Sequence, residues 1–100
     1  MTPKEQITEI VLRAVRATGE STNNDLLRQA TLETRLYGEK SGLDSLNLVN
    51  LIADVELGVF EIFGRDVTLA DDAAASEARS PFRRVATLID YVEARLAKPQ

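Results

Sequence analysis

Ser41-Gly42-Leu43-Asp44-Ser45-Leu46 is the stretch that decides the fold of this chain, because a long apolar run, residues 48–63, follows it directly. Gly42 gives the backbone freedom before Asp44, which is a typical N-cap residue, and Ser45 then stands at the head of a predicted helix. A helix N-terminus favours phosphate, because its free amides and its macrodipole are both positive there. The pattern therefore predicts a surface serine suited to modification by a phosphate-containing group.

The residues after this stretch repeat at helical spacing and predict a helix that ends at Gly64. The main apolar face of this helix consists of Leu48, Leu51, Ile52, Val55, Val59, Ile62 and Phe63. Leu46 and Val49 lie off this face, and we expect them to dock a partner protein. Phe60 also lies off it, and here we expect burial on a second side of the helix. Gly58 indicates either a close helix crossing or a bend.

Two further long helices are predicted from their apolar spacing and their end signals. The first begins with a capping box at Thr2 and Glu5, and we expect Gly19 to end it. The last begins at Ser80-Pro81, which has the order of an N-cap and a first-turn proline. Their apolar stripes consist of Ile7, Ile10, Val11, Ala14 and Val15 in the first helix and Val85, Leu88, Ile89, Val92 and Leu96 in the last.

Residues 20–43 form a long connection before the central helix. Asn23 or Asn24 can cap a short helix within this connection. The apolar residues of that short helix are Leu26, Leu27 and Ala30. Residues 31–42 are expected to be irregular. The expected anchors of this irregular stretch in the core are Leu32, Leu36 and Tyr37.

These elements predict an all-α fold, a four-helix bundle of three main helices and one short one, with a long connection between the first two helices. The short helix of the bundle is expected at residues 73–78. Asp66, Asp71 and Asp72 lack the spacing of a calcium loop and are read as helix-capping residues. We expect residues 1–100 to form a single domain.

The composition excludes several classes of function. The chain has no histidine and no cysteine, which removes the commonest general base and the usual metal ligands. This argues against most hydrolases and metalloenzymes, and we expect no metal site. No apolar segment approaches the length of a transmembrane helix, and residues 1–5 do not resemble a signal peptide, so we expect a cytoplasmic protein without membrane insertion.

The net charge of −4 is concentrated in one segment of the chain. Residues 44–72 carry seven acids and a single base, whereas residues 1–43 are balanced and residues 73–100 carry a net charge of +2. Such a segment attracts basic proteins and repels nucleic acid. The cluster of Arg79, Arg83 and Arg84 is too small for a nucleic-acid surface, and we expect it to pair with the acidic segment.

Gly42-Leu43-Asp44-Ser45-Leu46 resembles the attachment motif of acyl carrier proteins and related carrier domains. In that family the matching serine receives 4′-phosphopantetheine from coenzyme A through a magnesium-dependent phosphopantetheinyl transferase, and the thiol of the arm holds an acyl group as a thioester. The resemblance implies that Ser45 is the covalent attachment site and that Asp44 and Leu46 belong to the recognition motif. It extends over most of the chain, and it implies that partner enzymes read the helix after Ser45. The partner-binding residues implied are Leu46, Asn47, Val49, Asn50 and Asp54.

The resemblance also implies that the chain has no catalytic residue and no enzyme activity of its own, and it implies which proteins the chain meets. The expected partners are the transferase, an acyl ligase or acyltransferase, and ketosynthase-type enzymes, with the carrier itself a monomer. Asn47 and Asn50 are neutral where carriers of fatty-acid synthesis usually have acids, which favours a specialised free-standing carrier of a surface-lipid or secondary-metabolite pathway. Two alternatives remain: an aminoacyl or peptidyl carrier, and a helical adaptor that binds partners without modification.

Overall fold

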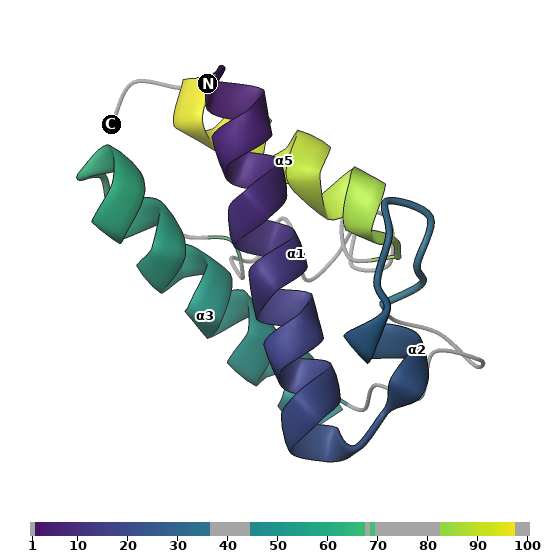
Figure 1. Ribbon diagram of the computed structural model, residues 1–100. Helices are drawn as coiled ribbons and strands as arrows, with labels where there is room; N and C mark the ends of the chain where they lie inside the picture. The colour runs from purple at the N-terminus through teal and green to yellow at the C-terminus, as the bar shows by residue number, and fades with distance from the viewer. Residues whose placement is uncertain (1, 37–44, 68, 70–82, 98–100) are drawn as a thin grey trace.

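Helices make up most of the computed structural model, which describes residues 2–36, 45–67, 69 and 83–97 (Figure 1). The helices in these ranges are α1 (Pro3–Thr22), α2 (Asp25–Arg28), α3 (Ser45–Phe63) and α5 (Val85–Ala97). The described residues contain no strand, only an isolated bridge between Arg35 and Arg84. This confirms the all-α prediction, with three main helices and one short one. The short helix is α2, within the long connection, and the short helix predicted at 73–78 lies outside the described residues.

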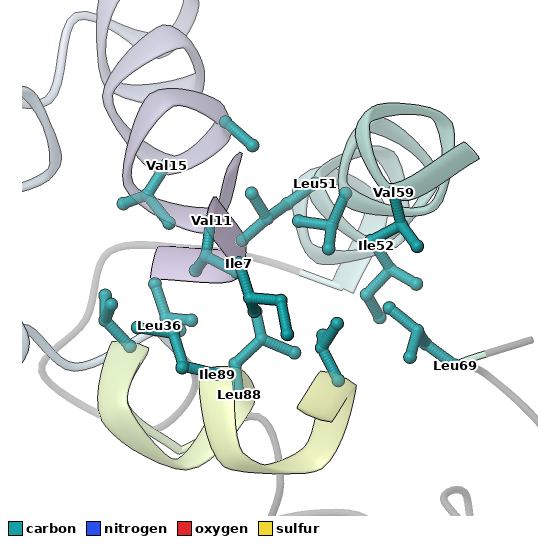
Figure 2. Close-up of a cluster of buried hydrophobic side chains, with 14 of the residues drawn as sticks. Ile7, Val11, Val15, Leu36, Leu51, Ile52, Val59, Leu69, Leu88 and Ile89 are labelled. Carbon is teal, nitrogen blue, oxygen red and sulfur yellow. The ribbon is translucent and has the colours of Figure 1, made fainter. Parts of the chain in front are cut away.

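The central element is α1, which packs against each of the other three helices (Figure 1). Among the described helices, α3 and α5 do not approach each other in this way, and they lie on different sides of α1. The core between them is closed by the apolar stripes that the sequence predicts, and Figure 2 shows these side chains meeting. Its fully or nearly fully buried helical residues are Ile7, Val11, Ala14 and Val15 of α1, Leu27 of α2, Leu51, Ile52, Val55 and Val59 of α3, and Val85, Leu88, Ile89 and Val92 of α5.

Two helices begin at the capping residues that the sequence predicts. At the start of α1 the Thr2 hydroxyl accepts a hydrogen bond from the Glu5 amide at 3.1 Å, and the Glu5 carboxylate accepts one from the Thr2 amide at 3.3 Å. At the start of α2 the Asn24 side chain accepts hydrogen bonds from the amides of Leu26 and Leu27, at 3.0 and 3.3 Å. Both caps satisfy amides that the first turn of a helix leaves without partners.

The end of α1 differs from the prediction. Gly19 does not end the helix, which continues to Thr22 and is closed by Asn23 in the left-handed conformation, at φ 56°. Gly19 is instead buried where α2 crosses α1, and a Cβ on it would lie 2.4 Å from the backbone nitrogen of Arg28. The glycine therefore allows close packing of two helices, whereas a C-cap glycine would allow a positive φ.

The ends of α3 and α5 are set in different ways. Gly64 ends α3 as predicted, with φ +69° and its amide donating to the Phe60 carbonyl at 2.8 Å. The predicted start of the last helix at Ser80-Pro81 is wrong, because α5 begins only at Val85. The amide of Val85 donates to the Thr34 carbonyl at 3.0 Å, so the long connection supplies acceptors to the first turn of α5.

The connection holds to the core through fewer side chains than expected. Leu36 is fully buried, as predicted, but Leu32 and Leu26 are exposed, and Tyr37 lies outside the described residues. Leu32 contributes through its backbone, because its carbonyl accepts a hydrogen bond from the Ala86 amide at 2.9 Å. Backbone hydrogen bonds therefore hold the long connection to α5 at a position where we expected an apolar side chain to do so.

Of the basic cluster near α5 the structure describes Arg83 and Arg84, and Arg84 does not pair as predicted. The guanidinium of Arg84 lies 4.0 Å from the carboxylate of Glu33, which belongs to the charge-balanced first part of the chain. The expected pairing of Arg84 with the acidic segment 44–72 is therefore wrong. Arg83 is exposed, and Arg79 lies outside the described residues.

The buried residue Leu69 links α3 to α5. Its amide donates to the Glu56 carboxylate on α3 at 2.8 Å, and its carbonyl accepts from the Tyr91 hydroxyl on α5 at 3.1 Å. Figure 2 shows the Leu69 side chain on the side of the core where Ile52 and Val59 lie. Leu69 therefore joins the two helices through one hydrogen bond to each.

Candidate functional site

Ser45 is the first residue of α3, which continues for 19 residues to Phe63. The prediction that a helix begins at the motif serine is therefore confirmed. Asp44, its predicted N-cap, lies outside the described residues, as does the rest of the motif before Ser45. The site that the structure describes accordingly consists of Ser45 and the helix that follows it.

The side of α3 opposite the core carries a second apolar face, which we call the outer face. It consists of Leu46, Val49, Ala53, Leu57 and Phe60, whose spacing of three and four residues places them along one line of the helix. All five are exposed, and the exposed fraction of the four large residues runs from 69% for Leu46 to 48% for Phe60. A helix that is apolar on both sides either is buried or has a face that something else covers.

The outer face includes residues that the sequence analysis assigned differently. Leu46 and Val49 are exposed, as their assignment to partner binding requires. The predicted burial of Phe60 is wrong, since nearly half of its surface is exposed. Leu57 was missed, although its distance of eight residues from Val49 and three from Phe60 is a signal present in the sequence.

The polar residues expected to bind partners fall into two groups. Asn50 and Asp54 are exposed and lie next to the outer face, on the following positions of the helix. Asn47 is half-buried, and its spacing of three residues from Asn50 and seven from Asp54 places it on the same side of the helix as these two. Asn47 therefore differs from the other predicted partner-binding residues in being half-buried.

The charges on α3 are all negative, because the helix contains no lysine or arginine. Glu56 is half-buried and bound to the Leu69 amide, so it belongs to the scaffold. Asp54 and Glu61 are exposed, and no residue in the described ranges forms an ion pair with either of them. These two carboxylates therefore set the charge beside the outer face.

A groove of about 260 Å³ lies where α3 crosses α1. Its walls come from Ile10, Ala14 and Ala17 of α1 and from Gly58 and Ile62 of α3. A Cβ at Gly58 would lie 2.7 Å from Cγ2 of Ile10, so of the two interpretations of this glycine the close crossing is the one observed. Ile62, predicted to face the core, is 52% exposed because it borders this groove.

The described residues contain no group of His, Cys, Asp or Glu side chains arranged to hold a metal ion. None of their helices combines the length and the apolar character that crossing a membrane requires.

Comparison with known proteins gives no family for this chain: no family model, no curated protein and no solved structure matches it. The resemblance to carrier proteins therefore depends on the motif at residues 42–46, of which the structure describes Ser45 and Leu46.

Proposed function

We propose that this chain is a carrier protein of the acyl-carrier type, with Ser45 bearing a covalent 4′-phosphopantetheine arm. The observation that supports it most is the position of Ser45 as the first residue of a 19-residue helix. The first-turn amides of such a helix lack intrahelical acceptors, and the positive end of its dipole stabilises a phosphodiester attached there. The exposed Leu46 and Val49 lie on the first two turns beside it, where a modifying enzyme would bind.

In this proposal the protein catalyses nothing and acts as a tether. A thioester on a flexible arm reaches each partner active site at the effective concentration of a linked substrate. The partners would be a phosphopantetheinyl transferase, an acyl ligase or acyltransferase, and ketosynthase-type enzymes, in the cytoplasm. They would dock on the first half of the outer face, beside Asn50 and Asp54.

Intact-mass spectrometry tests the attachment site. Incubation with coenzyme A, Mg²⁺ and a promiscuous phosphopantetheinyl transferase should add one phosphopantetheine to the wild-type chain. Ser45→Ala should abolish the addition, and Ser41→Ala, which changes the neighbouring serine outside the motif position, should leave it intact. The circular dichroism of Ser45→Ala should match that of the wild type, since a residue at a helix start contributes little to the core. Labelling that persists in Ser45→Ala would contradict the assignment.

One observation also favours the adaptor alternative, namely the continuous apolar outer face of α3. An unmodified adaptor would bind its partners through this face whether or not Ser45 carries an arm. If the transferase adds no mass to the wild-type chain, while substitutions on the outer face still abolish binding to a co-purifying protein, the adaptor interpretation replaces the carrier.

A further inference from the structure

The groove at Gly58 and the end of the outer face form one continuous surface near the C-terminal end of α3, which we call the distal surface. Gly58 lies 13 residues after Ser45, which is about 20 Å along the helix axis. Leu57, Phe60 and Ile62 are its large exposed apolar residues, at 57%, 48% and 52%. This surface is therefore distant from the attachment site, although its Asp54 also borders the first half of the outer face, and nothing about it depends on modification of Ser45.

The groove has the size and lining of a site for a side chain of another polypeptide. Gly58 brings the two helix axes close together, while Ala14 and Ala17 are too small to fill the space beside the crossing. Its volume of about 260 Å³ lies below the range of roughly 300–1,000 Å³ typical of small-molecule pockets. A large apolar side chain from a partner would bury apolar surface against Ile10 and Ile62.

The rims of the groove specify the charge of that partner. Asp54 and Glu61 stand on the α3 rim, seven residues and therefore two turns apart, and separate the groove from Leu57. Arg13 stands on the α1 rim. No described residue forms an ion pair with any of these three, so two carboxylates oppose one guanidinium.

Three strips lie side by side across this surface: an apolar strip at Leu57, an acidic strip at Asp54 and Glu61, and a second apolar strip in the groove. A complementary segment has a lysine or arginine with apolar residues on both sides of it. A second copy of this chain is a poorer match, because a symmetric pair would place four carboxylates against two copies of Arg13.

We propose that the distal surface is a docking site for a short basic amphipathic helix of a partner protein, with one apolar side chain in the groove and a lysine or arginine between Asp54 and Glu61. The apolar contacts supply the larger part of the affinity, and the charges select a basic partner over an acidic one. The site operates with or without an arm on Ser45.

The test uses ¹⁵N-labelled full-length protein and a synthetic helical peptide in which leucine and lysine alternate at i, i+3 and i+4 spacing. Amide shifts should be largest for Ala14, Ala17, Gly58 and Ile62, and the same shifts should occur in Ser45→Ala. A peptide with glutamate in place of lysine should bind at least about tenfold more weakly, and 0.5 M salt should reduce the difference.

Variants of the protein separate the two kinds of contact. Neutralising both acids, with Asp54→Asn and Glu61→Gln together, should raise Kd for the lysine peptide about three- to tenfold. Ile62→Ser should raise Kd by about tenfold or more, and because Ile62 lies at the surface, the circular dichroism should stay unchanged. Leu26→Ser, an exposed leucine on α2, is the matched control and should leave Kd unchanged.

Three results would overturn the proposal: equal binding of the glutamate and lysine peptides, amide shifts centred on the start of α3, or no measurable binding of the lysine peptide. Each is independent of the mass measurement on Ser45. The measurements can therefore contradict the carrier function and still support the docking site on the distal surface. They can equally support the carrier function and contradict the docking site.

Discussion

Substitution of Gly19 by alanine sets helix propensity against tertiary packing, and the structure predicts which of them prevails. Within a helix, alanine is more favourable than glycine by about 1 kcal/mol, so the sequence alone predicts a gain in stability for Gly19→Ala. The added Cβ would lie 2.4 Å from the Arg28 backbone nitrogen and 2.8 Å from the Leu27 carbonyl carbon. Ordinary carbon contacts are about 3.5–4.0 Å, so α2 has to move away from α1 by about 1 Å.

The cost of this movement exceeds the gain in propensity. Overpacking a well-packed site costs about 1–3 kcal/mol, and here the contacts are backbone atoms that no rotamer change can relieve. The same movement stretches the hydrogen bond from the Asn24 amide to the Gly19 carbonyl, now 2.8 Å, which contributes about 1 kcal/mol. We expect Gly19→Ala to lower the free energy of unfolding by about 2–3 kcal/mol, and Tm by roughly 10–20 °C for a chain of this length.

Urea unfolding followed by circular dichroism at 222 nm measures the change, with the m-value showing that the same surface is exposed. Gly64→Ala is the matched control, since it has a φ of +69° and no atom within 4 Å of an added Cβ. Its cost of about 1–2 kcal/mol comes from backbone conformation alone. If Gly19→Ala is as stable as the wild type or more stable, the close crossing of α1 and α2 is wrong.

Three further predictions test other contacts. Gly58→Ala should lower the free energy of unfolding by about 1 kcal/mol, because the added Cβ overlaps Ile10. In a double-mutant cycle measured by urea unfolding, the Gly58→Ala and Ile10→Ala double variant should lose less stability than the sum of the losses in the two single variants. Tyr91→Phe should lower the free energy of unfolding by about 1 kcal/mol through loss of its hydrogen bond to the segment between α3 and α5, and an unchanged urea midpoint would show that this bond is not formed in solution. Leu46→Ser should slow transfer of phosphopantetheine to the chain several-fold, whereas Leu26→Ser, equally exposed on α2, should not, and equal rates for the two variants would exclude Leu46 from recognition.

Features that depend on neighbouring residues in the chain could be predicted from the sequence. The capping box of Thr2 and Glu5, the Asn24 cap and the left-handed Gly64 each work through contacts within four residues. The apolar stripes are equally local, because a helix of 3.6 residues per turn places them on one face wherever the helix lies. These signals suffice for an all-α fold with α3 beginning at Ser45.

Features that depend on a distant segment could not be predicted in this way. Gly19 followed by polar residues is a typical C-cap signal, and only the position of α2 shows that it serves a close crossing. Ser80-Pro81 is likewise a sound local start for a helix. The start of α5 at Val85 is set by the carbonyl of Thr34, which is 51 residues away in the chain.

The candidate site illustrates the same limit in part, because periodicity identifies the core face of α3 but does not show that Leu57 and Phe60 stay exposed on the other side. The crossing with α1 decides it, since Gly58 permits close approach only on the side where Val55 and Val59 are buried. The remaining apolar residues, from Leu46 to Phe60, are then left at the surface along the whole length of the helix. In a protein with a net charge of −4, such a face is costly unless a partner covers it for part of the time. The same packing that gives α3 its place in the fold therefore leaves it with an exposed apolar face, and the proposed docking on both halves of the helix depends on that exposure.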